Sequence, residues 1–193
     1  MQIVTYSMHS PFVTPDHLRG ISFSPAIPKV MNDYMTIANY TDKGLGIILD
    51  YLKSRPDYDD TLIVITGDHE GLASFRNSLC ESEAGRGIVS EHQYTPLIVL
   101  NSPVEMRCDK VMGQIDIYPT LLGLLGLNDY CWHGLGGSIL DPGKPSAAVN
   151  HQLAVEGQAD DATIDRLRRA FDISDKIIRF DYFSREAAAN DMK

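Results

Sequence analysis

The sequence predicts an α/β fold in which a mostly parallel sheet is covered by helices. Residues 2–8 and 61–67 are short runs rich in apolar and β-branched side chains, which is typical of buried strands. Between them, residues 31–54 repeat apolar side chains at every third or fourth position, the period of an amphipathic helix. Strand, helix and strand in this order indicate a βαβ unit with a right-handed crossover.

The first predicted strand ends at His9, because Pro11 cannot continue a central strand. Residues 13–30 are rich in proline and are predicted to form a long loop. The helix predicted at 31–54 ends before Pro56. Its apolar face is formed by Tyr34, Ala38, Thr41, Leu45, Ile48 and Leu52.

The run at 61–67 is nearly continuous in apolar residues, and such strands are buried on both faces of a sheet covered by helices. Residues 71–93 are polar and contain glycine, which favours a loop. Two later segments are predicted as strands, a third strand at 94–100 and a short fourth one at 112–115.

Two further helices are predicted in the second half of the chain. One covers residues 118–125 and has Pro119 in its first turn, where proline is tolerated. The other begins at Asp160 or Asp161, either of which is a good helix cap. Its apolar face contains Ile164, Leu167 and Phe171.

The composition excludes several classes of protein. A chain of 193 residues with 44% hydrophobic and 22% charged residues is ordinary for one large globular domain. Seventeen basic against 26 acidic residues give a net charge of −9, which disfavours nucleic-acid binding because that needs a basic surface. No run of about 20 apolar residues occurs, so no membrane span is predicted in this chain. Cys80, Cys108 and Cys131 are too few and too scattered for a disulfide framework.

The most informative segment is Gly67–Asp68–His69–Glu70–Gly71, which follows the predicted strand at 61–67. Ligands of open α/β sheets bind at the carboxyl ends of the strands. Neighbouring carboxylate and imidazole groups can both bind a divalent metal where the backbone turns sharply, and the flanking glycines permit that turn. A second reading remains open, in which Asp68 caps a helix and His69 is a partly buried polar residue.

Two more histidines are candidates for contact with a substrate. His9 follows the carboxyl end of another predicted strand, so His9 and the Asp68–His69 pair could line one crevice. There His9 would donate a hydrogen bond to an anionic oxygen or join the metal ligands. His92 precedes the strand at 94–100 and would reach that crevice if its loop folded over, although it could equally be a solvated loop residue.

Six segments in a fixed order are similar to one known family. They cover residues 1 to about 183 and include the His9–Ser10–Pro11–Phe12 and Gly67–Asp68–His69 segments. Together they resemble the sulfatase-like phosphoglycerol transferases of the alkaline phosphatase superfamily, especially the extracellular domain of lipoteichoic acid synthases. The segments are Thr5–Phe12, Tyr40–Gly46, Asp60–His69, Thr95–Val99, Gly113–Leu122 and Ile173–Tyr182.

The resemblance implies a three-layer α/β/α sandwich and a metal-dependent enzyme with a Thr, Ser or formylglycine nucleophile. It implies that Asp68 and His69 are metal ligands and that His9 contacts the substrate, an anionic phosphoglycerol or sulfate ester. It also implies a cell-envelope location and a membrane anchor in the full-length protein. In this family the nucleophile and an acidic ligand precede the segment of His9. We therefore expect residues 1–193 to be the C-terminal portion of one catalytic domain, without the nucleophile and inactive alone.

The residues at the site favour some metals and reactions over others. An imidazole nitrogen suits Mn²⁺ or Zn²⁺ better than Ca²⁺ or Mg²⁺, which prefer shells of oxygen. Many sulfatases hold Ca²⁺ with an Asp–Asn pair at this place, so His69 favours phosphoryl transfer over sulfate hydrolysis.

Two alternative functions stay open. One is a two-metal phosphodiesterase of the same superfamily, to which only His9 and His92 could add ligands. The other is a non-catalytic binding or scaffold module with the same fold. We also expect self-association, because part of a sheet exposes an edge or an apolar face.

Overall fold

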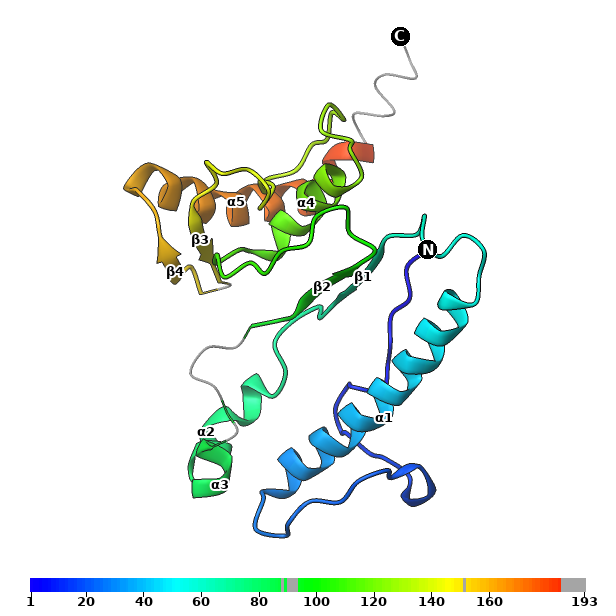
Figure 1. Cartoon of the computed structure of the whole chain (residues 1–193). Helices are drawn as coiled ribbons and strands as arrows, with labels where there is room; N and C mark the ends of the chain where they lie inside the picture. Colours follow the sequence, from blue (N-terminus) through cyan, green and yellow to red (C-terminus); the bar gives the residue numbers. More distant parts are fainter. Residues whose placement is uncertain (88, 90–93, 151, 185–193) are drawn as a thin grey trace. The chain divides into compact units, whose positions relative to one another are not determined.

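The computed structural model describes residues 1–87, 89, 94–150 and 152–184 (Figure 1). The chain divides into two compact units, the first from Met1 to Asn101 and the second from Ser102 onward. Both units combine helices with a small sheet, as expected for an α/β protein. In the described residues, no helix is both long enough and apolar enough to cross a membrane.

The first unit is built around one long helix and a two-stranded sheet (Figure 1). Helix α1 (Lys29–Lys53) confirms the helix predicted at 31–54. Its buried residues Met31, Thr36 and Ile37 lie in its first half. The other elements of this unit are η1 (Asp16–Leu18), β1 (Ile63–Thr66), η2 (Ala73–Phe75), α2 (Arg76–Cys80), α3 (Glu83–Arg86) and β2 (Leu97–Leu100).

Strands β1 and β2 confirm the strands predicted at 61–67 and 94–100, but they pair antiparallel, with Ile63 opposite Leu100 and Thr66 opposite Leu97. The parallel pairing predicted for the sheet is therefore wrong for these strands. The connection between β1 and β2 reverses the chain direction, and Asn101, just after β2, bonds to the segment just before β1. The Asn101 side-chain amide donates to the carbonyl oxygens of Tyr58, at 2.7 Å, and Thr61, at 3.0 Å.

The strand predicted at 2–8 does not form, and no βαβ unit arises in the described residues. Residues 1–6 have no secondary structure, and Val4 and Tyr6 are 80% and 83% exposed. Apolar β-branched composition shows only that a segment suits a sheet, whereas a strand also needs a neighbour to pair with. The chain then turns, with the His9 amide donating to the Tyr6 carbonyl at 3.1 Å.

The segment predicted as a loop at 71–93 contains short helices. Leu79 is fully buried and anchors α2, while the Ser82 hydroxyl caps α3 by accepting from the Gly85 amide at 2.9 Å. A Cβ at Gly85 would lie 1.9 Å from the Leu79 carbonyl oxygen, so only glycine fits there. These local contacts, which the polar composition does not reveal, make the segment helical.

The second unit contains two α-helices and a hairpin of two strands. Helix α4 (Ile117–Leu124) and helix α5 (Asp161–Arg179) confirm both predicted helices, and Asp160 caps α5 by accepting from the Thr163 amide at 2.7 Å. On α5, Ala170 is buried, but Phe171 is 42% exposed and lies outside the buried face. The strands are β3 (Ser146–Val149) and β4 (Val155–Gln158), paired antiparallel.

The strand predicted at 112–115 is wrong. Residues Gln114–Asp116 form the 3-10 helix η3, because the Asp116 carboxylate folds back and accepts from the Gly113 amide at 2.9 Å. The core of this unit contains Leu122, Ile139, Ala147 and Ala170.

Candidate metal centre

Asp68 and His69 follow the carboxyl end of β1, where the sequence places them. Their side chains are open to solvent, 85% exposed for Asp68 and 72% for His69. The alternative reading of His69 as a partly buried polar residue is therefore wrong. Both side chains are accessible to an ion or an anionic substrate from solution.

Three contacts fix how the two side chains lie. The Asp68 carboxylate accepts a hydrogen bond from the His69 amide at 3.0 Å. The His69 ring places Nδ1 2.8 Å from the Glu70 carbonyl oxygen. The other ring nitrogen, Nε2, lies 3.7 Å from Asp68 Oδ2. The carboxylate and the imidazole are therefore adjacent, and neither side chain is directed into the core.

The contact with Glu70 assigns the tautomer of the His69 ring. A carbonyl oxygen only accepts, so Nδ1 carries the proton and the lone pair of the neutral ring is on Nε2, the atom nearer Asp68. In metalloproteins, a ligating histidine usually donates its other N–H to a carbonyl or a carboxylate in this way. The same carbonyl, and then the Asp68 charge, raise the pKa of His69 because both favour the imidazolium.

The distance between His69 Nε2 and Asp68 Oδ2 is close to that of two ligands on one metal ion. Nitrogen and oxygen ligands about 2.1 Å from one ion lie roughly 3.0–3.4 Å apart at octahedral or tetrahedral angles. The observed 3.7 Å is only slightly longer, so a small side-chain rotation would bring both ligands onto one ion. Among the described residues no group of three or more His, Cys, Asp or Glu side chains is placed to hold a metal. The pair would therefore supply two ligands of a larger set.

His9 is exposed and held by its neighbours in sequence. Its Nδ1 lies 2.7 Å from the Ser10 carbonyl oxygen, and its ring stacks on Tyr6 with 5.6 Å between centroids. Nδ1 is therefore the donor in the neutral ring, and Nε2 gains a proton only in the imidazolium. His92 lies outside the described residues.

The segments that carry His9 and His69 meet on helix α1, at Tyr34. Phe12, just after His9, is buried and packs edge-on against Tyr34 at 5.3 Å between centroids. Phe12 also packs against Phe75, at 6.3 Å, in the segment after His69. Gly71 lies against the Tyr34 hydroxyl. Phe12 and Gly71 thus contact the same residue of α1, which sequence patterns alone did not identify. That His9 and the Asp68–His69 pair line one crevice stays a prediction.

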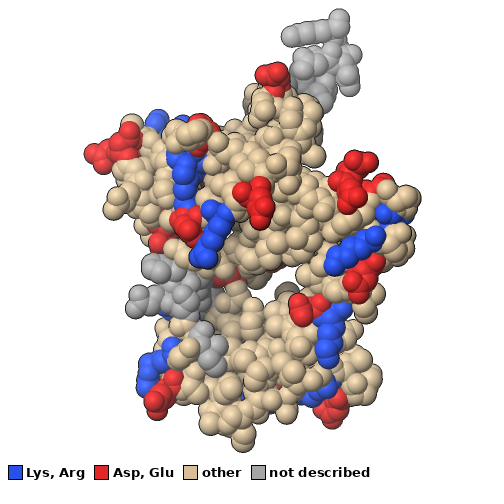
Figure 2. All heavy atoms as spheres, viewed as in Figure 1, with Lys and Arg blue, Asp and Glu red and all other residues tan. Residues whose placement is uncertain are grey.

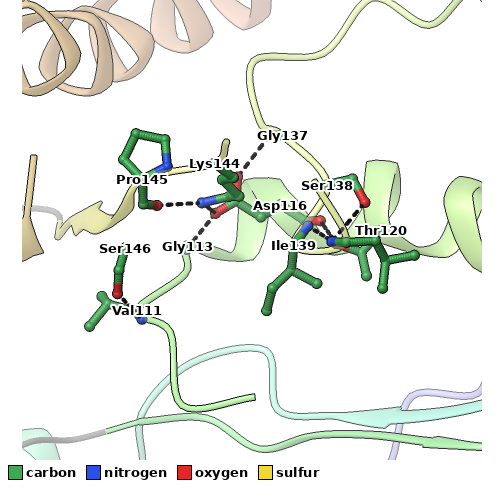
Figure 3. Close-up of polar contacts among 11 residues, drawn as sticks. Val111, Gly113, Asp116, Thr120, Gly137, Ser138, Ile139, Lys144, Pro145 and Ser146 are labelled. Carbon is green, nitrogen blue, oxygen red and sulfur yellow. Dashed lines mark hydrogen bonds and ion pairs between the residues drawn. The ribbon is translucent and has the colours of Figure 1, made fainter. Parts of the chain in front are cut away.

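The second unit has a buried polar cluster of a different kind (Figure 3). Lys144 Nζ lies 2.9 Å from Asp116 Oδ2, and the side chains are 10% and 4% exposed. Asp116 also accepts from the amides of Gly113 and Gly137, both at 2.9 Å. Every partner is another part of the fold, so this cluster is structural.

Charge is distributed without a basic patch on the face shown in Figure 2, where Lys and Arg side chains lie among Asp and Glu. Several are paired along α5, such as Lys176 with Asp172 and Arg179 with Asp175. The three cysteines, all in the described residues, are not disulfide-bonded.

Comparison with known proteins identifies related sequences over most of the chain. The family model described as Sulfatase matches residues 1–127. Lipoteichoic acid synthase 2 of Bacillus subtilis (strain 168) is 24% identical over 208 residues, covering 93% of this chain and 32% of that protein.

Two staphylococcal proteins give similar matches. Lipoteichoic acid synthase of Staphylococcus saprophyticus is 27% identical over 143 residues, covering 72% of this chain and 22% of that protein. Lipoteichoic acid synthase of Staphylococcus aureus (strain USA300) is 27% identical over 132 residues, covering 65% of this chain and 20% of that protein. The chain therefore spans a third or less of the length of these relatives.

Proposed function

This chain belongs to the sulfatase family, and we propose that it is the C-terminal portion of a metal-dependent enzyme acting on an anionic phosphoryl or sulfuryl ester. Phosphoglycerol transfer is the reaction we favour, and hydrolysis of a sulfuric ester is the alternative reaction. The similarity to lipoteichoic acid synthases supports the transfer reaction. In the complete domain we propose the three-layer α/β/α arrangement of this superfamily and a cell-envelope location.

The observation that carries the proposal is the geometry of Asp68 and His69. Nδ1 of His69 is 2.8 Å from a carbonyl oxygen, and Nε2 is 3.7 Å from Asp68 Oδ2. This geometry supports a mixed oxygen–nitrogen pair that would hold a single divalent ion. We propose Mn²⁺ or Zn²⁺ over Ca²⁺ or Mg²⁺, because imidazole is a poor match for the latter two.

Metal binding and substrate contact would be performed by different side chains. Asp68 and His69 would hold the ion, which supplies Lewis acidity and lowers the pKa of a bound hydroxyl. His9, as an imidazolium, would donate from Nε2 to a non-bridging oxygen of the transferring group while Nδ1 stays on the Ser10 carbonyl. A charged donor there stabilises negative charge on the equatorial oxygens of that group.

The 193 residues are proposed to be inactive without the rest of the domain. In the family that the chain resembles, the nucleophile precedes the His9 segment, and loss of a covalent nucleophile removes several orders of magnitude in rate. Two ligands also chelate a metal weakly compared with a set of four.

Turnover and metal binding test the proposal together. The chain is incubated with Mn²⁺ and an aryl phosphodiester or aryl sulfate, and Mn²⁺ binding is followed by electron paramagnetic resonance. We expect weak binding that is lost in Asp68→Ala and His69→Ala, and no turnover. Robust turnover that disappears in Asp68→Ala would contradict the proposed inactivity, whereas Mn²⁺ binding that is unchanged in both variants would contradict the assigned site. A scaffold module would show neither turnover nor binding that depends on Asp68.

A further inference from the structure

The two glycines that flank Asp68 and His69 lie close to other parts of the first unit. Left-handed φ values occur at other glycines, Gly126 and Gly157, and not at Gly67 or Gly71. The backbone does bend at Asp68 and His69, and it does so without a left-handed φ at either glycine. A Cβ at Gly71 would lie 2.5 Å from the Tyr34 hydroxyl oxygen and 3.1 Å from Cζ of that ring. Real Cβ atoms do not approach so closely, so the backbone here rests directly on the tyrosine.

The other glycine has its own partner. A Cβ at Gly67 would lie 3.2 Å from Thr95 Cγ2 and 3.4 Å from Thr95 Cβ, tighter than ordinary packing. Thr95 is half-buried just before β2, the strand that pairs with β1. The segment 67–71 is therefore in contact with protein at both ends, while the two side chains between them, Asp68 and His69, are exposed.

Tyr34 is itself held in place. It comes from α1, and the buried Phe12 packs edge-on against its ring, with Phe75 on another side of Phe12. Edge-to-face aromatic pairs have a preferred geometry beyond simple burial of area. The surface that Gly71 contacts is thus part of a packed cluster.

We propose that Tyr34 and Thr95 are positioning residues that clamp segment 67–71 at its two glycines and so preorganise Asp68 and His69 for one metal ion. This inference rests on the proposed function. An exposed segment would otherwise sample many conformations, and ordering it would oppose metal binding. Contacts at both ends remove much of that freedom before the ion arrives.

The sharpest test is a pair of size-compensating substitutions in the full 193-residue chain. Gly71→Ala adds a methyl group against Tyr34. Tyr34→Phe keeps the ring that packs on Phe12 but removes the hydroxyl oxygen, which is the nearest atom. The matched control is Gly46→Ala, because a Cβ at Gly46 has no neighbour within 4 Å.

Two measurements are made on each variant. Hydrogen–deuterium exchange of the amides in segment 67–71 reports whether the segment is held, and Mn²⁺ titration reports whether the ligands are positioned. We expect Gly71→Ala to speed exchange and weaken Mn²⁺ binding by about 10-fold or more, the scale seen for groups that support metal ligands. Adding Tyr34→Phe should recover most of both effects, and Gly46→Ala should change neither.

Exchange and Mn²⁺ binding at wild-type levels in Gly71→Ala would overturn the clamp, as would equal defects with and without Tyr34→Phe. The proposed function fails separately, when Mn²⁺ binding to the wild-type chain is absent or independent of Asp68. In that case hydrogen–deuterium exchange still decides whether the clamp exists. Faster exchange in Gly71→Ala that Tyr34→Phe reverses supports the clamp, and unchanged exchange in Gly71→Ala refutes it.

Discussion

Lys144 Nζ lies 2.9 Å from Asp116 Oδ2 in the interior of the second unit (Figure 3). The same carboxylate accepts from the amides of Gly113 and Gly137. The Asp116 side chain thus joins η3 to the loop that contains Gly137 and to Lys144, which lies just before β3. Four groups depend on each other, so removal of Asp116 affects more than one contact.

Asp116→Ala is expected to lower the free energy of unfolding by about 3–5 kcal/mol, because it leaves a buried ammonium group without its partner. Urea denaturation of the full chain measures this change. Asp109→Ala is the matched control, since the Arg107–Asp109 pair is fully on the surface and should hardly move the midpoint. Similar midpoints for the two variants would show that the buried pair is not needed for stability.

The cap of α5 predicts a dependence of stability on pH. Hydrogen bonds from Thr163 lower the pKa of Asp160 below its usual 3.8. The pKa of Asp160 is thus lower in the folded state than in the unfolded state. The cap therefore stabilises the fold at pH values above the unfolded-state pKa, and this stabilisation is lost as the pH falls through the folded-state pKa.

Asp160→Asn keeps a good cap without a titrating group, so its stability relative to wild type should rise as the pH falls below about 4. Circular dichroism of denaturant titrations at pH 7 and pH 3 measures the difference. A wild-type–to–variant difference that is equal at the two pH values would be inconsistent with this role of Asp160.

Metal binding should also depend on pH, through His69. The Glu70 carbonyl and the Asp68 charge raise its pKa, so the imidazolium persists to higher pH and its proton competes with a metal at Nε2. Mn²⁺ affinity is therefore expected to fall as the pH drops through that raised pKa.

Mn²⁺ titrations at several pH values measure this effect, with His133→Gln as a control because His133 is exposed in the other unit. The control should reproduce the wild-type profile, and His69→Gln should lose both the affinity and its dependence on pH. A flat wild-type profile would exclude His69 as a ligand.

Exposed apolar side chains predict self-association. Val4 and Tyr6 are 80% and 83% exposed, and Ile98 in β2 is 48% exposed. Isolated two-stranded sheets with accessible edges are prone to pair with another chain. Light scattering should show a mass that rises with protein concentration and falls in Val4→Lys, with Glu105→Lys as a control for the added charge. A constant monomer mass at high concentration would refute the prediction.

The helices could be predicted from the sequence because their signals are local. The apolar period of α1 and the cap at Asp160 lie within the segments that they specify. The strand predicted at 2–8 failed because pairing depends on a distant partner, which composition does not contain. The direction of pairing between β1 and β2 is equally non-local, since it depends on the path of the long connection between them.

The candidate site could be predicted from the sequence because its two residues are also local to each other. Asp68 and His69 are neighbours in the chain, so their closeness needs no knowledge of packing. The contact of Tyr34 with Gly71 joins a helix to a distant segment and becomes visible only in the fold. The orientation of the His69 ring through the Glu70 carbonyl likewise depends on the local backbone, which the residue types did not specify.

The most direct test of the proposed metal site is the anomalous scattering of crystals of this chain soaked in Mn²⁺. We expect a peak within bonding distance of both a carboxylate oxygen of Asp68 and Nε2 of His69, with Nδ1 still on the Glu70 carbonyl. A peak held by other residues, or no peak near this pair at saturating Mn²⁺, would contradict it.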